Sequence, residues 1–157
     1  FDYGSGQSAI HVWRSSGSGF NAPQWWYEST SYYGYSTNCV GNRFAAGNFN
    51  GDGKDDIASM YDDGNGKMRI HVFKSTGSNF KPDPVNKPWF WETWHSQTNE
   101  GYYYCSSLGN FIAGAFNGDN KSDIVTRYNY SLGSSQLHRF LSTGTSFPSS
   151  TIWITLY

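Results

Sequence analysis

The stretch that decides the fold is residues 44–61, FAAGNFNGDGKDDIASMY. Two short apolar runs, 44–49 and 57–61, flank a polar loop with oxygen-bearing side chains at alternate positions and a glycine in the middle. A loop that wraps a hard cation such as Ca²⁺ needs this pattern, because alternate side chains point inward and the glycine allows a sharp bend. The candidate metal ligands of this first loop are Asn48, Asn50, Asp52, the carbonyl of Lys54, and Asp56.

The first loop is not an EF-hand, although its ligand spacing agrees over the first nine positions. With Asn48 as position 1, an EF-hand would carry Glu at position 12, where this chain has Ser59. The flanking runs are also typical of strands and not of helices. A metal-free alternative remains open, in which Asn and Asp side chains accept hydrogen bonds from the loop backbone.

The same loop recurs in residues 111–128, FIAGAFNGDNKSDIVTRY. This second loop is degenerate, because Ala115 replaces one ligand and Asn120 replaces the central glycine. Its candidate ligands are Asn117, Asp119, the carbonyl of Lys121, and Asp123. A different segment, which runs from an apolar residue and a histidine to a phenylalanine, occurs three times, at 10–20, 70–80 and 137–147. The chain is therefore a repeat array.

Residues 47–57, GNFNGDGKDDI, resemble the FG-GAP (VCBS-type) repeat of integrin alpha-subunit propellers. The Trp- and Phe-containing strands look like those of sugar-binding propeller lectins built from such repeats. The resemblance covers nearly the whole chain, and it implies an all-β fold of four-stranded β-propeller blades. It also implies secretion and calcium, as a structural ion, in the loops.

The repeat boundaries divide the chain into three units. Residues 1–42 are expected to be a partial blade of outer strands with a connection, 43–109 a complete blade with the calcium loop and a connection, and 110–157 a blade with the degenerate loop. Strands are expected near 8–14, 25–29, 43–49, 56–62, 68–75, 88–94, 110–116, 123–129, 135–141 and 151–156.

These strands make about two and a half blades, whereas propellers close with about 4–8. Each repeat needs neighbours to bury its face. The sequence therefore predicts either the remainder of a longer propeller or a protomer that completes one as a homo-oligomer. Cys39 and Cys105 stand at equivalent places in successive repeats, and either free thiols or a disulfide fits them.

Composition excludes several classes of function. The 157 residues carry a net charge of −1 without a basic stripe, so no nucleic-acid partner is expected. No apolar run is long enough for a membrane span. The chain has no nucleophile elbow and no phosphate-binding glycine loop, so an enzyme is not expected. His11, His71 and His138 occupy one place in three repeats, which favours a packing role.

Aromatic residues, 19% of the chain, exceed what blade cores of this size need. Flat ring faces beside polar groups suit a pyranose, although packing between blades is the alternative for each ring. The candidate ligand-binding residues are Trp25, Tyr32, Tyr33, Trp91, Trp94, His95 and Tyr102. Trp94, His95 and the tyrosine-rich connections are expected to be exposed, because binding residues favour loops.

The sequence therefore predicts an extracellular, lectin-like module that binds a carbohydrate or glycoprotein. One alternative is a structural or adhesive module that binds protein or assembles with itself. Another is an accessory domain of a larger secreted protein.

Overall fold

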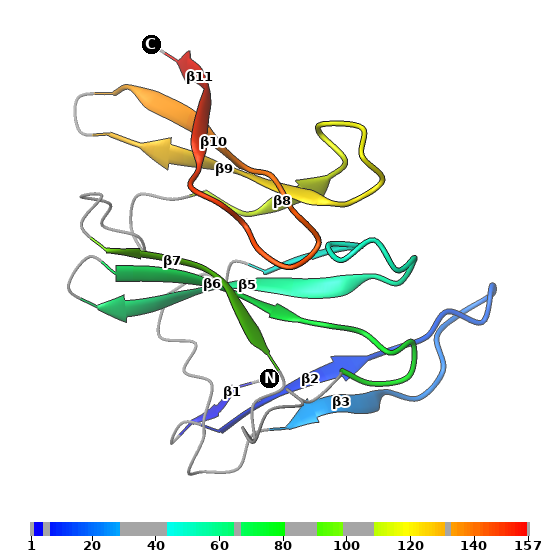
Figure 1. The fold of residues 1–157 in the computed structure, drawn as a ribbon. Coiled ribbons are helices and arrows are strands. Elements are labelled where there is room, and N and C mark those ends of the chain that lie inside the picture. The colour runs from blue at the N-terminus through cyan, green and yellow to red at the C-terminus, as the bar shows by residue number, and fades with distance from the viewer. Residues whose placement is uncertain are drawn as a thin grey trace.

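The computed structural model describes residues 2–4, 7–28, 44–64, 67–80, 91–98, 109–130 and 133–156 (Figure 1). These residues form eleven strands in three antiparallel sheets. The expectation of an all-β fold with antiparallel sheets is confirmed. The described residues contain no helix that could span a membrane.

Each sheet is a meander whose strands pair in the order of the chain, and Figure 1 shows the three sheets stacked one above another. The first sheet consists of β1 (Asp2–Gly4), β2 (Gln7–Val12) and β3 (Gln24–Glu28). The second consists of β4 (Phe44–Gly47), β5 (Asp56–Gly64), β6 (Lys67–Phe73) and β7 (Glu92–Thr98). The third consists of β8 (Ile112–Gly114), β9 (Asp123–Asn129), β10 (Ser135–Phe140) and β11 (Thr151–Leu156).

The last strand of the second sheet lies further along the chain than expected. It begins at Glu92, whereas the sequence pattern placed it near 88–94. In the pairing register, Thr93 lies opposite His71, as Trp25 lies opposite His11. Trp25 therefore corresponds to Thr93 and not to a residue of the aromatic run at 89–91, which the sequence pattern would align with it.

A β-bulge occurs at the same place in all three sheets and fixes the correspondence between their last strands. The pairing skips one residue on the last strand of each sheet, and that residue is a tryptophan: Trp26, Trp94 and Trp153. A bulge leaves its extra residue out of the ladder and re-aims its side chain. The three bulged tryptophans therefore project differently from their strand neighbours.

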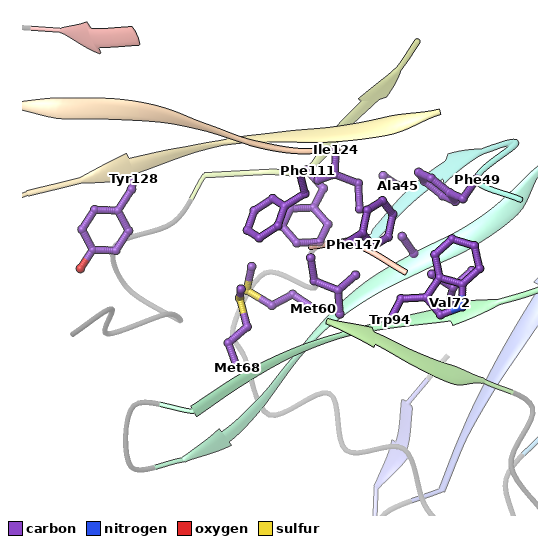
Figure 2. Close-up of a cluster of buried hydrophobic side chains, with 13 residues drawn as sticks. Ala45, Phe49, Met60, Met68, Val72, Trp94, Phe111, Ile124, Tyr128 and Phe147 are labelled. Atoms are coloured by element: carbon purple, nitrogen blue, oxygen red, sulfur yellow. The ribbon is translucent and has the colours of Figure 1, made fainter. Parts of the chain in front are cut away.

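The main core lies between the second and third sheets (Figure 2). Ile70 and Val72 on β6 have no exposed surface, and side chains of this size each contribute about 1.5–3 kcal/mol when fully buried. The cluster consists of Ala45, Phe49, Ala58, Met60, Met68, Ile70, Val72, Trp94, Phe111, Ile124, Tyr128, Phe140 and Phe147. A smaller cluster around Tyr27, Phe73 and Phe80 joins the first and second sheets.

The second and third sheets approach most closely at their first strands. A Cβ atom added to Gly47 would lie 2.7 Å from the Cβ atom of Ser122 and 3.3 Å from that of Ala113. Beside this contact, the backbone N–H of Ser122 donates to the carbonyl of Asn48 at 2.9 Å. Only glycine fits at position 47, because neither neighbour is a long side chain that could move away.

Candidate functional site

The first loop, residues 48–56, is folded by two successive turns that its own side chains close. Oδ1 of Asn50 accepts a hydrogen bond from the backbone N–H of Asp52 at 2.9 Å. Oδ1 of Asp52 accepts one from the N–H of Lys54 at 2.9 Å, and its Oδ2 lies 3.3 Å from the ammonium of Lys54. Gly51 and Gly53 take the left-handed conformation, with φ of 80° and 81°, which lets the turns follow each other.

Two oxygen atoms of the first loop are buried and lack a hydrogen bond of ordinary length and angle: Oδ1 of Asn48 and Oδ2 of Asp56. The other oxygen of Asp56 accepts a hydrogen bond from the N–H of Ser75 at 2.9 Å. Burial raises the pKa of Asp56 to about 6 and the charge of Asp52 acts in the same direction, while the backbone amide of Ser75 and, more weakly, those of Asn50 and Phe49 lower it. Leaving such an atom unsatisfied costs about 1–3 kcal/mol, which a bound cation would relieve.

The residues of the first loop therefore fit calcium, which prefers carboxylate, amide and carbonyl oxygens. The described residues contain no group of three or more His, Cys, Asp or Glu that could hold a metal. A cation here would be bound through the carboxylates of Asp52 and Asp56, with amide and backbone oxygens completing its shell. The ammonium of Lys54, which now faces Asp52, would have to move away.

The second loop has the same turns but satisfies its own buried carboxylate. Asn120, with φ of 64°, takes the left-handed conformation that Gly53 takes in the first loop. Both oxygens of Asp123 accept backbone hydrogen bonds, from Ser142 at 2.8 Å and from Phe116 at 3.0 Å. With no orphaned carboxylate and with Ala115 in place of a ligand, this loop fits a cation less well.

The remaining predicted ligands of the second loop repeat the pattern of the first. Oδ1 of Asn117 accepts from the N–H of Asp119 at 3.1 Å, and Oδ1 of Asp119 accepts from the N–H of Lys121 at 3.0 Å. The ammonium of Lys121 lies 2.8 Å from Oδ2 of Asp119. An ion pair thus holds the carboxylate that a metal would use.

The expectation that Trp94 and His95 are exposed is wrong: 4% and 7% of their surfaces are accessible. Because β7 begins only at Glu92, both residues lie within a strand that the third sheet covers. The ring of Trp94 packs 5.4 Å from that of Phe147, and Nδ1 of His95 lies 2.9 Å from the Phe147 carbonyl. Neither ring presents a face that a ligand could reach.

Trp91 is half-buried between the first and second sheets. Its ring stacks on His71 at 5.8 Å and meets the edge of Tyr27 at 6.0 Å. Packing between sheets accounts for its position. Predicted residues Tyr32, Tyr33 and Tyr102, with Cys39 and Cys105, lie outside the described residues.

Trp25 is 57% exposed on the outer strand of the first sheet, and it forms an aromatic ledge with His11 and Trp13. The rings of Trp25 and His11 are nearly parallel, with centroids 5.0 Å apart and an interplanar angle of 16°. Trp13, which is 45% exposed, lies 6.0 Å from His11. Sequence reasoning missed Trp13 and His11 as part of this surface, although their alternation with Val12 put them on one face of the strand.

Two of the three repeated histidines are buried packing groups, as the repeat pattern indicated. His71 lies between Tyr61 and Trp91, and burial, with a smaller contribution from the charge of Arg69, lowers its pKa to about 3. Burial also lowers the pKa of His138. Both rings are therefore neutral at physiological pH.

In comparisons with known proteins, no family model, no curated protein and no solved structure matched the chain. The FG-GAP-type repeat and the lectin resemblance therefore stay expectations that rest on the sequence motif.

Proposed function

We propose that the chain is a calcium-stabilised binding module of the β-propeller type, which acts outside the cell by lectin-like binding of a carbohydrate or glycoprotein. The observation that carries the sugar-binding proposal is the aromatic ledge of His11, Trp13 and Trp25. Its two tryptophans are about half exposed, and one of them is held flat by a parallel ring. No catalytic role is proposed.

The ledge suits a sugar because of its shape and its rigidity. The C–H face of a pyranose stacks on a flat indole face, while its hydroxyl groups need polar partners nearby. Ser15 and Ser16, which follow Trp13 after β2, offer such groups. A ring that is already held by His11 loses little side-chain entropy when a ligand binds.

A glycan array, with competition by free sugar, tests the proposal. We expect hits that the free sugar removes, and we expect Trp25→Ala to weaken them about fivefold or more, since stacking on one ring contributes about 1 kcal/mol or more. Tyr130→Ala, which changes an exposed aromatic residue of the third sheet, is the matched control and should keep the hits. Hits that resist competition, or that survive in Trp25→Ala, would refute the ledge as a sugar site.

The proposed calcium site rests on the two orphaned oxygens of the first loop. Extracellular calcium modules bind with dissociation constants of about 0.1–1 mM. At a dissociation constant of about 1 mM, 10 mM Ca²⁺ should stabilise the fold by about 1.4 kcal/mol. Nothing in the loop suggests more than a structural role for the ion.

Urea unfolding in 10 mM CaCl₂ and in EDTA tests the calcium site. Asn48→Ala gives the first loop the pattern of the second and should abolish most of the difference. Asn117→Ala, the control in the second loop, should preserve it. Equal unfolding midpoints in CaCl₂ and EDTA for the unvaried chain would overturn the proposal.

We interpret the three sheets as propeller blades, the first of which lacks the innermost strand among the described residues. A closed propeller needs about 4–8 blades, so further blades must come from a longer chain or from further copies of this one. The alternative function, a self-assembling module, is favoured by a separate observation at the two outer faces of the stack.

A further inference from the structure

One contact recurs at both junctions between sheets. Phe80, in the turn after β6, packs on Trp26 of the first sheet, and Phe147, after β10, packs on Trp94 of the second. Both pairs of ring centroids lie 5.4 Å apart, and each Phe N–H donates to the carbonyl of its Trp, at 3.4 and 2.9 Å. Figure 1 shows both loops reaching from their own sheet towards the preceding one. We call each such phenylalanine a plug.

The first sheet carries a preformed plug that lies exposed among the described residues. Phe20 follows β2 as Phe80 follows β6, yet it is 75% exposed, whereas Phe80 and Phe147 are 1% and 2% exposed. All three turns are closed by the same backbone hydrogen bond, Ser16 N to Gly19 O at 2.9 Å, Thr76 N to Asn79 O at 2.9 Å, and Thr143 N to Ser146 O at 3.0 Å. The conformation of the plug is therefore present before it docks.

The third sheet carries the complementary socket. In the second sheet, the socket for Phe147 is made by Phe49, at 5.7 Å, and by the bulged Trp94 (Figure 2). Phe116 and the bulged Trp153 are the equivalents of Phe49 and Trp94 in the third sheet. With no plug between them, their rings pack on each other, 5.5 Å apart, and the ring of Phe116, which lies against Gly114, would move aside when a plug enters. Trp153 is 46% exposed here, while Trp94 is 4% exposed.

The surroundings of this socket are also apolar and uncovered. All six residues of β11 are exposed, and Ile152, Ile154 and Leu156 are 57%, 50% and 43% accessible. A hydrogen-bond partner for an incoming plug is in place as well. In the covered junction, the hydroxyl of Ser142 donates to the Phe49 carbonyl at 2.7 Å. Ser15 is the equivalent of Ser142 in the first sheet, and Phe116 is the equivalent of Phe49.

We propose that a second copy of this chain docks head to tail, with Phe20 of one copy in the Phe116–Trp153 socket of the other. The partner is a second copy because the socket fits one kind of turn, and the chain presents that turn, uncovered, at its opposite face. The interface would continue the junctions already formed between the sheets of one chain. The inference rests on the propeller arrangement proposed above, but on neither sugar nor calcium binding.

Two copies suffice to close a ring. A head-to-tail contact either closes or continues into a filament. Two chains with three sheets each supply six sheets. If each sheet is one blade, this number lies within the range of about 4–8 blades that propellers use. A closed pair of copies uses both plugs and both sockets and leaves neither apolar face in water.

Light scattering coupled to size exclusion tests the proposal at about 100 μM protein. The unvaried chain should have twice the mass of one 17.7 kDa chain. Phe20→Glu and Trp153→Glu should each be monomeric, because a charge cannot be buried at the seam. Tyr130→Glu, an exposed substitution away from the plug and socket, should remain dimeric.

Mixing the two monomeric variants provides the decisive step. Phe20→Glu retains an intact socket and Trp153→Glu retains an intact plug, so an equimolar mixture should form a dimer with one seam. A misfolded variant could not restore this contact. A monomeric unvaried chain, variants that still dimerise, or a mixture that stays monomeric would each overturn the proposal. Docking would cover the ledge, because the equivalents of His11 and Trp13 at the covered junction, His71 and Phe73, are only 3% and 1% exposed. The glycan array is therefore read with Trp153→Glu, which keeps the ledge uncovered. Failure of sugar binding there would leave the masses unchanged, so the two proposals can still fail separately.

Discussion

Replacing Phe147 with alanine removes the plug between the second and third sheets and leaves their backbones unchanged. Only 2% of the side chain is exposed, and it packs on Phe49 and Trp94. Phe→Ala substitutions in cores destabilise by about 3–5 kcal/mol. The alanine N–H can still donate to the Trp94 carbonyl, so we expect a loss near the lower end, about 3–4 kcal/mol.

The loss is measured by urea unfolding followed by far-UV circular dichroism. Both the variant and its control are made in a Trp153→Glu background, where the proposed seam between copies cannot form. The control is Phe20→Ala, which stands at the same place in the turn of the first sheet but is 75% exposed. Exposed substitutions of this kind change the free energy of unfolding by about 0.5 kcal/mol or less.

Two outcomes for the loss in the free energy of unfolding would contradict this prediction. Equal losses for Phe147→Ala and Phe20→Ala would mean that neither ring is packed between sheets. A loss of less than about 1 kcal/mol for Phe147→Ala would mean that the junction does not depend on its plug. In either case the description of the junctions, and the inference drawn from their repetition, would be wrong.

Three further predictions concern the interior and the loops. His71 has a lower pKa when folded, about 3, than when unfolded, about 6.5, so its contribution to stability is complete above pH 6.5 and is lost as the pH falls towards 3. His71 alone should therefore lower the free energy of unfolding by about 2 kcal/mol between pH 7 and pH 5, while Asp56, whose folded pKa of about 6 lies above its unfolded value of 3.8, acts in the opposite direction. The contribution of His71 is the difference between the pH slopes of the unvaried chain and of His71→Phe in urea titrations; equal slopes would contradict it. Gly53→Ala should lower the melting temperature, because alanine at φ of 81° costs about 1–2 kcal/mol, and Gly53→Asn should lower it less, because Asn120 already adopts φ of 64°; equal losses would contradict this reading of the turn. Asp123→Ala should cost about 2–4 kcal/mol in chemical denaturation, because it leaves two backbone amides, including that of Ser142, without their acceptor; a loss below about 1 kcal/mol would show that these hydrogen bonds contribute little.

The arrangement of strands followed from the sequence because the repeats supply independent copies of the same evidence. The runs near 56–62 and 123–129 each follow an Asn- and Asp-rich loop, and β5 and β9 both begin where that loop ends. One copy alone would have left the alternation of apolar residues ambiguous. The last strand, expected near 151–156, is β11 with the same bounds.

The register of β7 could not be predicted, because two aromatic runs compete for the same place. Residues 89–91 look more like the Trp25–Tyr27 run than residues 92–95 do, but the pairing depends on a bulge at Trp94. A bulge is a backbone feature without a fixed sequence signal. The error placed Trp94 at the end of the expected strand and His95 in the connection after it, where both were expected to be exposed, whereas both lie inside β7.

The loops show a second limit on sequence reasoning. The ligand pattern ranked the first loop above the second, but it could not show how each buried carboxylate is satisfied. That depends on the amides of Ser75, Ser142 and Phe116, which the fold brings to the two aspartates from other parts of their units. Hydrogen bonds across 19 residues leave no periodic trace in the sequence.

The close approach at Gly47 bears on the angle between neighbouring sheets. The backbone of Gly47, on the first strand of the second sheet, meets the side chain of Ser122 just before β9, where an added Cβ atom would lie 2.7 Å away, while aromatic rings separate the same two sheets near Trp94. A stack that is thin along one edge and thick along the other must curve, and its curvature adds up over every junction. The absence of a side chain at Gly47 therefore helps to set the angle between neighbouring sheets. A methyl group there would push the two sheets apart at their thin edge and reduce the curvature of the stack. In a closed assembly, such a change would alter how many sheets complete the circle.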